Sequence, residues 1–174
     1  MSKAFIGTSG WTYDGWRGRF YLEDLRKRDW LAWYATQFPT TEINGSFYRT
    51  PSLDAVRMWR DQTPRDFLFA WKASKFITHW KRLGEACANS IALMETRLKA
   101  LSPKIGAVLF QLPPQFSKNR DRLASFLNML PRGYRSRSNF VIRVGMTMRS
   151  SIFCTSMTCR YVYRTITMHP HRGK

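Results

Sequence analysis

The sequence predicts an α/β fold in which helices cover a parallel sheet. Over the first 135 of the 174 residues, four apolar runs of strand length alternate with four segments whose apolar residues recur at helical spacing. The strand-like runs are apolar almost throughout, which is typical of strands buried on both faces. Such alternation produces parallel strands, and both a (β/α) barrel and a doubly wound sheet satisfy it.

The predicted strands are residues 3–7, 40–44, 67–71 and 107–112. The first leads into a Thr-Ser-Gly turn at 8–10, and the last is stopped by two prolines at 113–114. Short apolar runs that end in turn signals favour strands over buried helices.

A predicted helix follows each strand. Asp29 and Ser52 stand where N-caps are expected for the first two helices. The apolar faces consist of Trp30, Trp33, Tyr34 and Phe38 in the first helix, Leu53, Val56 and Trp59 in the second, Ile91, Met94, Leu98 and Leu101 in the third, and Leu123, Phe126, Leu127 and Leu130 in the fourth.

Polar residues stand at the carboxyl ends of the predicted strands. They are Thr8, Ser9, Glu42, Asn44, Lys72 and Gln111. Active sites of (β/α) barrels gather at this end of the strands, although doubly wound sheets use the same edge. The placement therefore favours the barrel slightly and leaves the doubly wound sheet open.

The composition indicates a globular cytoplasmic protein. The chain is 44% apolar and 15% aromatic, and no run of about 18 apolar residues predicts a membrane helix. Gly7 interrupts the first apolar run too early for a signal-peptide core. Three cysteines, at 87, 154 and 159, fit a reducing compartment without a disulfide framework.

The net charge of +18 would normally indicate a nucleic-acid partner, but its distribution is uneven. Residues 1–135 hold 22 Lys and Arg against 11 Asp and Glu. Residues 136–174 hold seven Lys and Arg and no carboxylate. Two compositional regimes therefore meet near residues 134–136, and the second needs its own explanation.

Four segments carry a family resemblance. They read GTSGW at 7–11 with WRG at 16–18 and FY at 20–21; EIN at 42–44 with SFY at 46–48 and Pro51; FLFAWKAS at 67–74 with ITH at 77–79 and Leu83; and GAVLFQLPP at 106–114. In this order they resemble the YecE-like family (domain of unknown function 72). The resemblance implies a TIM-barrel-like (β/α) fold that is truncated here after about four βα units. Residues 1–135 would then form the amino-terminal half of the barrel.

In that family the fourth unit is followed by a strand of the form Phe-Glu-Phe-Arg-His-x-Ser-Trp. Residues 138–151 read SNFVIRVGMTMRSS. If codons for that string are read one nucleotide earlier, they can encode FEFRHPSWYDDEIF, which contains the expected strand. The residue in the present sequence largely determines the second base of each codon in the shifted frame, so the choice of codons is limited. We therefore predict a one-nucleotide frameshift near residues 134–136, with 136–174 an out-of-frame tail without native fold. The alternative is an authentic basic tail that folds on nucleic acid.

Glu42, Lys72 and His79 are the candidate catalytic residues. Glu42 and Asn44 alternate along one strand, so both side chains can face the barrel interior or its mouth. A buried carboxylate needs a partner, which Lys72 can supply. In the functional reading Glu42 is a general base or metal ligand, while Lys72 and Gln111 hold an anionic or hydroxylated substrate. In the structural reading the same pair is an internal salt bridge.

The resemblance makes His79 a site candidate, although a lone histidine is more often structural. Six aromatic residues crowd the first two βα loops, namely Trp11, Tyr13, Trp16, Tyr21, Phe47 and Tyr48. Most are expected to pack, and only Trp11 and Tyr48 are kept as binding candidates. Ser9, Asn44 and Gln111 complete the predicted binding residues.

No metal site or cofactor is assigned. Cys154, Cys159, His169 and His171 imitate zinc-ligand spacing but lie in the segment predicted to be out of frame. The function expected is that of an uncharacterised YecE-like barrel protein with an unknown small-molecule substrate, and the enzyme class considered for it is a hydrolase or isomerase acting on a sugar or phosphorylated compound. The chain itself is expected to be inactive if its site needs later strands. Nucleic-acid binding through a basic, aromatic-rich surface is the alternative, and a product without function is the third reading.

Overall fold

The computed structural model describes residues 5–117, 119–131, 139–144, 152–154 and 163–166. Its strands are β1 (Phe5–Ser9), β2 (Thr40–Ile43), β3 (Leu68–Lys72), β4 (Ile105–Leu112), β5 (Asn139–Val144), β6 (Ile152–Cys154) and β7 (Tyr163–Ile166). Within the described ranges they form one seven-stranded sheet in the order β6-β5-β4-β3-β2-β1-β7. All neighbours are parallel except β5 and β6, which run antiparallel. The sheet is therefore the parallel α/β type that the sequence predicts.

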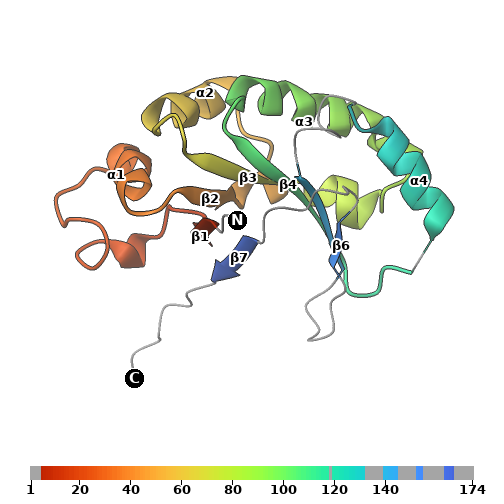
Figure 1. The fold of residues 1–174 in the computed structure, drawn as a ribbon, viewed down its shortest axis with the longest axis horizontal. Helices are drawn as coiled ribbons and strands as arrows, with labels where there is room; N and C mark the ends of the chain where they lie inside the picture. Colours follow the sequence, from red (N-terminus) through yellow and green to blue (C-terminus); the bar gives the residue numbers. More distant parts are fainter. Residues whose placement is uncertain (1–4, 118, 132–138, 145–151, 155–162, 167–174) are drawn as a thin grey trace, which may run out of the picture.

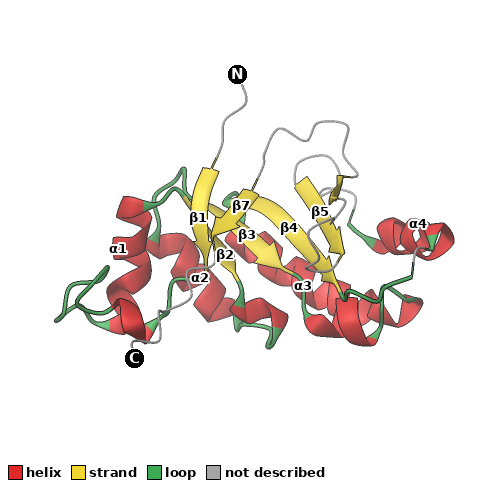
Figure 2. Ribbon diagram, turned by 90° about the horizontal axis from the view of Figure 1, so that it is seen from below, coloured by secondary structure: helices red, strands yellow, loops and turns green. Residues whose placement is uncertain are grey.

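Helices lie along one side of this sheet, as Figure 1 and, from below, Figure 2 show. They are α1 (Trp30–Gln37), α2 (Leu53–Gln62), α3 (Ala88–Leu101) and α4 (Arg120–Met129). Each of β1 to β4 is followed by one of them, which is the chain order of βαβ units. The predicted alternation over the first 135 residues is confirmed.

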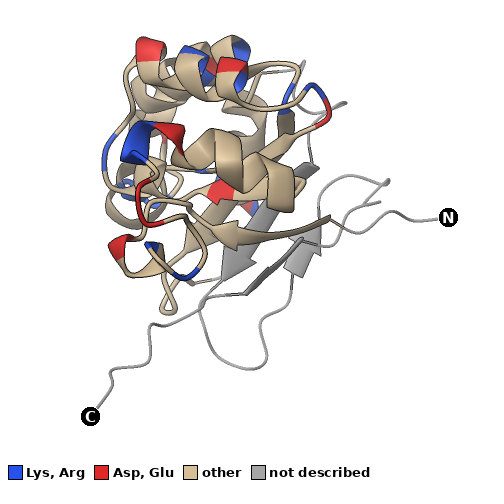
Figure 3. Cartoon of the chain, turned by 90° about the vertical axis from the view of Figure 1, so that its left-hand side faces the viewer, with Lys and Arg blue, Asp and Glu red and all other residues tan. Residues whose placement is uncertain are grey.

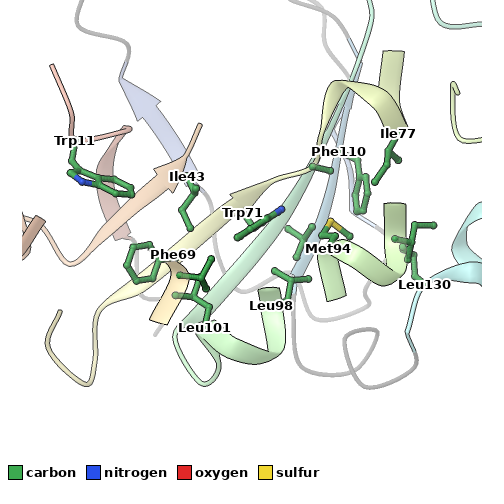
Figure 4. Close-up of a cluster of buried hydrophobic side chains, with 14 of the residues drawn as sticks. Trp11, Ile43, Phe69, Trp71, Ile77, Met94, Leu98, Leu101, Phe110 and Leu130 are labelled. Carbon is green, nitrogen blue, oxygen red and sulfur yellow. The ribbon is translucent and has the colours of Figure 1, made fainter. Parts of the chain in front are cut away.

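The hydrophobic core fills the space between the sheet and the helices (Figure 4). Trp71 and Phe110 point from the strands into it and are 2% and 0% exposed. Leu98 and Leu101 of α3 and Phe126 of α4 meet them from the helix side. Because side chains alternate along a strand, the residues between the core positions face the opposite side of the sheet.

Two residues of this opposite side lie in register across β1 and β2. Ser9 pairs with Glu42, and Glu42 pairs in turn with Ala70 of β3. Directly paired residues point to the same face of a sheet. The sheet register therefore places the polar Ser9 and Glu42 side by side, away from the helices.

The two predicted helix caps have different outcomes. The Ser52 hydroxyl accepts a hydrogen bond from the Ala55 amide at 3.1 Å, so Ser52 caps α2 as expected. Asp29 precedes α1 but makes no capping bond with its side chain. Its carboxylate instead accepts from the Arg26 guanidinium at 3.1 Å. The Asp29 prediction was wrong because Asp29 ends the 3₁₀ turn Lys27–Asp29 and has helical backbone angles, whereas an N-cap residue is typically extended.

Segment 136–174 is described only where it forms β5, β6 and β7. β5 pairs with β4 in the parallel direction, next in order after the four predicted strands. Cys159, His169 and His171 lie outside the described residues. The division of the chain at residue 135 and the shifted reading frame stay predictions.

Lys104 ties the start of β4 to the end of α2. Its buried ammonium donates to the Arg60 carbonyl oxygen, to the Thr63 carbonyl oxygen at 2.6 Å and to the Thr63 hydroxyl at 3.1 Å. The last carbonyls of a helix have no partner within the helix, and a cation there is favourable. The side chain therefore caps α2 from another element.

We expect Lys104→Met to lower the free energy of unfolding by about 2–3 kcal/mol, because buried carbonyl oxygens lose their donor. Urea unfolding followed by fluorescence measures the change. Lys27→Met is the control, because Lys27 is exposed and its loss should leave stability almost unchanged. Equal stability of the two variants would contradict the capping role of Lys104.

Candidate functional site

A buried ion pair lies at the carboxyl end of the strands. The Lys72 ammonium lies 3.5 Å from the Glu42 carboxylate, and their side chains are 15% and 9% exposed. The same ammonium donates to the Asn44 side-chain oxygen at 3.0 Å. The Ser9 hydroxyl donates to the Glu42 carboxylate, also at 3.0 Å. Four of the eight sequence-predicted site residues therefore form one hydrogen-bonded group, which we call the mouth cluster: Ser9, Glu42, Asn44 and Lys72.

The turn after β2 positions Asn44 for this contact. β2 ends at Ile43, and Asn44 has helical backbone angles and leads into the 3₁₀ turn Gly45–Phe47. The Ser46 hydroxyl lies 2.6 Å from the carbonyl oxygens of both Ile43 and Lys72. This hydroxyl joins the ends of β2 and β3, so the backbones that carry Glu42 and Lys72 are held together.

The Gly-Thr-Ser-Gly turn after β1 depends on both of its glycines. A Cβ at Gly7 would collide with the Thr40 carbonyl of β2, so glycine allows the two strands to approach. Gly10 has a φ of +91°, a conformation that favours glycine. Beyond this turn the Tyr13 hydroxyl returns to donate to the Ser9 carbonyl oxygen. Burial, and next the Glu42 charge, raise the pKa of Tyr13, so its hydroxyl stays protonated at neutral pH.

Phe47 joins the mouth cluster to His79. The Lys72 ammonium lies 5.1 Å from the centre of the Phe47 ring, and the His79 ring meets Phe47 edge-on at 5.2 Å. A cation over an aromatic face is attracted by the ring quadrupole. Sequence analysis treated Phe47 as packing and missed this role, because an apolar residue in a turn carries no polar signal.

His79 is held in its neutral form. A ring nitrogen, Nδ1, lies 2.9 Å from the Thr78 hydroxyl. Burial lowers the pKa of His79 below its ordinary value, and the charges of Lys72 and Lys75 lower it further. A neutral imidazole can accept a proton, which suits a general base at neutral pH.

The lowered pKa of His79 predicts a pH dependence of stability. As pH falls through about 6.5, the unfolded chain takes up a proton on this residue before the folded protein does. Stability is therefore lost as pH falls from about 6.5 towards the lower folded pKa. We expect His79→Gln to remove this part of the loss, measured by urea unfolding between pH 7.5 and 5.5. An NMR titration midpoint for His79 at or above the ordinary histidine value would contradict the prediction.

The other three predicted binding residues are not members of the mouth cluster. Trp11 is 8% exposed and packs edge-on against Trp59 and Phe69 in the core. Tyr48 is 69% exposed, beside the Lys75 ammonium. Gln111 is half-buried on β4, two residues beyond Leu109, the register partner of Lys72. Binding roles for these three residues stay predictions.

The mouth cluster has the composition of an acid–base site more than of a metal site. Glu42 is the only carboxylate in it, and the Lys72 ammonium already occupies the cation position beside that carboxylate. Within the described residues no three His, Cys, Asp or Glu side chains gather as a metal-binding group. Glu42 can accept a proton, while the ammonium and the Asn44 amide can stabilise a negative oxygen.

A parallel sheet with helices on one side and a polar cluster at the carboxyl strand ends defines a (β/α)-barrel-like protein. The chain belongs to the family described as "Protein of unknown function DUF72", whose model matches residues 5–169. It is 32% identical to the UPF0759 protein YecE of Escherichia coli K12 over 128 residues, which are 73% of this chain and 44% of YecE. It is 31% identical to the UPF0759 protein YunF of Bacillus subtilis over 126 residues, 69% of this chain and 43% of YunF.

Solved structures of the same family share the fold. A DUF72 family protein from Thermotoga maritima matches with a TM-score of 0.62 at 23% identity, over 80% of this chain and 54% of that one. A DUF72 family protein from Enterococcus faecalis matches with a TM-score of 0.62 at 21% identity, over 82% and 50%. The chain thus spans about half the length of the relatives it matches. No helix among the described residues is long and apolar enough to cross a membrane.

Proposed function

We propose that the mouth cluster is the first half of the active site of an enzyme that acts on a small sugar or phosphorylated compound as a hydrolase or isomerase. The buried Glu42–Lys72 pair is the observation that carries this proposal. Burying two charges costs several kcal/mol per ion, and well-packed apolar residues often give equal or better stability. This costly pair lies at the carboxyl ends of the strands, where active sites of (β/α) barrels gather, and its position therefore supports a chemical role.

Each residue of the cluster has a distinct role in this proposal. Glu42 is the general base, because its buried carboxylate has oxygens that can accept a proton and lies 3.5 Å from the Lys72 ammonium. Lys72 stabilises the negative charge that develops on a substrate oxygen. Ser9 and Asn44 are positioning residues that hold these two groups through the 3.0 Å hydrogen bonds described above. His79 supplies a second proton-transfer group beyond the Phe47 ring.

The remaining half of the site belongs to strands that follow β4. We propose that a frameshift near residues 134–136 replaced them in this chain. One choice of codons for the neighbouring frame gives Arg-His and Asp-Asp groups, which suit acid–base chemistry and would lie at or just after the end of the next strand. Sequencing codons 130–140 tests the frame, and early stop codons in the neighbouring frame would contradict it.

The test of function compares this chain with the protein from the frame-restored gene. We expect the restored protein to turn over members of a panel of sugar phosphates and nitrophenyl glycosides, and the 174-residue chain to be inactive. Glu42→Gln in the restored protein should lower kcat by at least about 100-fold, as loss of a general base does. Turnover that survives this substitution would exclude Glu42 as the base.

Nucleic-acid binding is the second candidate, because Lys and Arg outnumber Asp and Glu two to one in residues 1–135. Figure 3 shows the two signs interspersed over the described helices in that view. Several basic side chains also pair with carboxylates, among them Arg26, Lys27 and Arg57. A titration of residues 1–133 with DNA and RNA at several salt concentrations separates the candidates, since phosphate contacts make affinity fall steeply with salt. Absence of salt-dependent binding would remove the second candidate.

A further inference from the structure

A pocket of about 230 Å³ lies next to the mouth cluster. It is bounded by the turn Gly45–Phe47 after β2, the π-helical turn Phe76–Trp80 after β3, and the first half of α3. Its inner wall is apolar and includes Trp71, Ile77 and Met94, whose side chains Figure 4 shows in the core. The volume lies below the range of about 300–1,000 Å³ that is usual for drug-sized ligands, so the pocket suits a small one.

Two exposed aromatic rings and one lysine form the rim of this pocket. Tyr48 is 69% exposed and Trp80 is 65% exposed, which is unusual for such large rings. The Lys75 ammonium lies 5.8 Å from the centre of the Tyr48 ring and 5.2 Å from that of Trp80. Cation–π attraction to two rings holds this ammonium at the pocket instead of leaving it free in solvent.

The lining chemistry favours an anionic ligand. Among the described residues that line the pocket, Lys75 alone carries a formal charge, so no carboxylate of the lining neutralises it. An ammonium in this position attracts phosphate or carboxylate oxygens. Side-chain hydroxyls of Thr50, Ser74 and Ser90 also line the pocket and can donate to or accept from a polyhydroxylated ligand.

We infer that this pocket binds a monosaccharide-sized ligand that carries one anionic group, with the anion on Lys75 and the ring against Tyr48 and Trp80. The hydroxyl-rich lining matches the hydroxyl groups of a sugar. The volume lies below the usual range for drug-sized ligands, which favours a monosaccharide-sized ligand over a larger nucleotide.

The pocket and the mouth cluster share one residue. Phe47 lines the pocket, and its ring also contacts the Lys72 ammonium at 5.1 Å. A sugar anchored by its anion at Lys75 therefore lies beside the group that we propose to carry out the chemistry. This assignment rests on the proposed function for the reaction, whereas binding itself depends on Lys75, Tyr48 and Trp80.

Titration of the 174-residue chain tests the inference, with isothermal calorimetry and tryptophan fluorescence as readouts. The probes are glucose 6-phosphate, glucose, inorganic phosphate and adenosine monophosphate at low ionic strength. We expect glucose 6-phosphate to bind at least tenfold more tightly than the other three probes. Lys75→Met should weaken its binding by at least tenfold, and Trp80→Ala by about threefold or more.

Lys27→Met is the matched control for Lys75→Met. Lys27 also lies over a tryptophan ring, 5.8 Å from the centre of Trp30, but it is paired with Asp14 at 2.6 Å and lies outside the pocket. Its substitution should leave binding unchanged. Near-ultraviolet circular dichroism confirms that each variant is folded before it is titrated.

Three outcomes would overturn the inference. They are no binding of glucose 6-phosphate to the folded chain, equal binding by the Lys75→Met variant, or tighter binding of adenosine monophosphate. The proposed function fails separately: if the folded chain binds glucose 6-phosphate through Lys75 but the frame-restored enzyme shows no turnover, the pocket stands and the enzyme assignment falls.

Discussion

We expect Lys72→Met to lower the free energy of unfolding by about 3–5 kcal/mol, because it leaves the Glu42 carboxylate buried without a cation. Glu42 is 8% exposed, so water cannot replace the lost ammonium without opening the ends of β2 and β3. The Asn44 side-chain oxygen loses its donor at the same time. Urea unfolding of the chain at low micromolar concentration, followed by fluorescence, measures this loss.

The double variant Glu42→Leu, Lys72→Met separates the functional reading of the pair from the structural one. If the pair is kept for chemistry, removing both charges should restore most of the stability that Lys72→Met loses, because an apolar pair avoids the desolvation cost. If the pair is an internal salt bridge that holds the barrel centre, the double variant stays as unstable as the single one. Recovered stability together with lost turnover in the frame-restored protein would support the functional reading.

Sequence reasoning could place Glu42 and Lys72 together because strand direction alone brings them to the same edge. In a parallel sheet every carboxyl end lies at that edge, so the residue type and its position after each strand were sufficient. A separate rule, that serine is favoured directly before an apolar helical pattern, correctly predicted Ser52 as a cap. Such rules succeed where the chain direction or a single helix determines which groups meet.

The sequence could not predict contacts that depend on how two loops meet. Phe47 touches both Lys72 and His79 only because the turn after β2 packs against the turn after β3. The rim formed by Tyr48, Lys75 and Trp80 depends on the same meeting of loops. No spacing rule links Phe47 and Tyr48 to the residues that follow β3, since the two groups lie on separate βα units whose distance is set by the sheet.

Trp11 illustrates the opposite difficulty. Its position in a glycine-rich loop at the barrel mouth suggests a ligand contact, and an aromatic ring can serve either binding or packing. In the structure its ring meets Trp59 of α2 edge-on at a centroid distance of 5.3 Å. The loop therefore folds back over the helix layer, and burial of the indole against α2 outweighs its exposure at the mouth.

We expect restoration of the reading frame to raise the melting temperature by more than about 10 °C relative to the 174-residue chain. The chain spans 44% of the length of YecE, and Ile6 on β1 is 57% exposed. Restored strands and helices would cover such apolar surface, and each Å² removed from water contributes about 25 cal/mol. Thermal melts followed by circular dichroism compare the two proteins.

The same comparison predicts a difference in association. A sheet that does not close into a barrel keeps strand edges that can pair with another chain. We therefore expect the 174-residue chain to associate as its concentration rises, and the restored protein to stay monomeric, as measured by sedimentation velocity. The opposite result would be a monomeric 174-residue chain that melts cooperatively at the same temperature as the restored protein. The described sheet would then need no further strands, and the proposal that later strands complete both the fold and the site would fail.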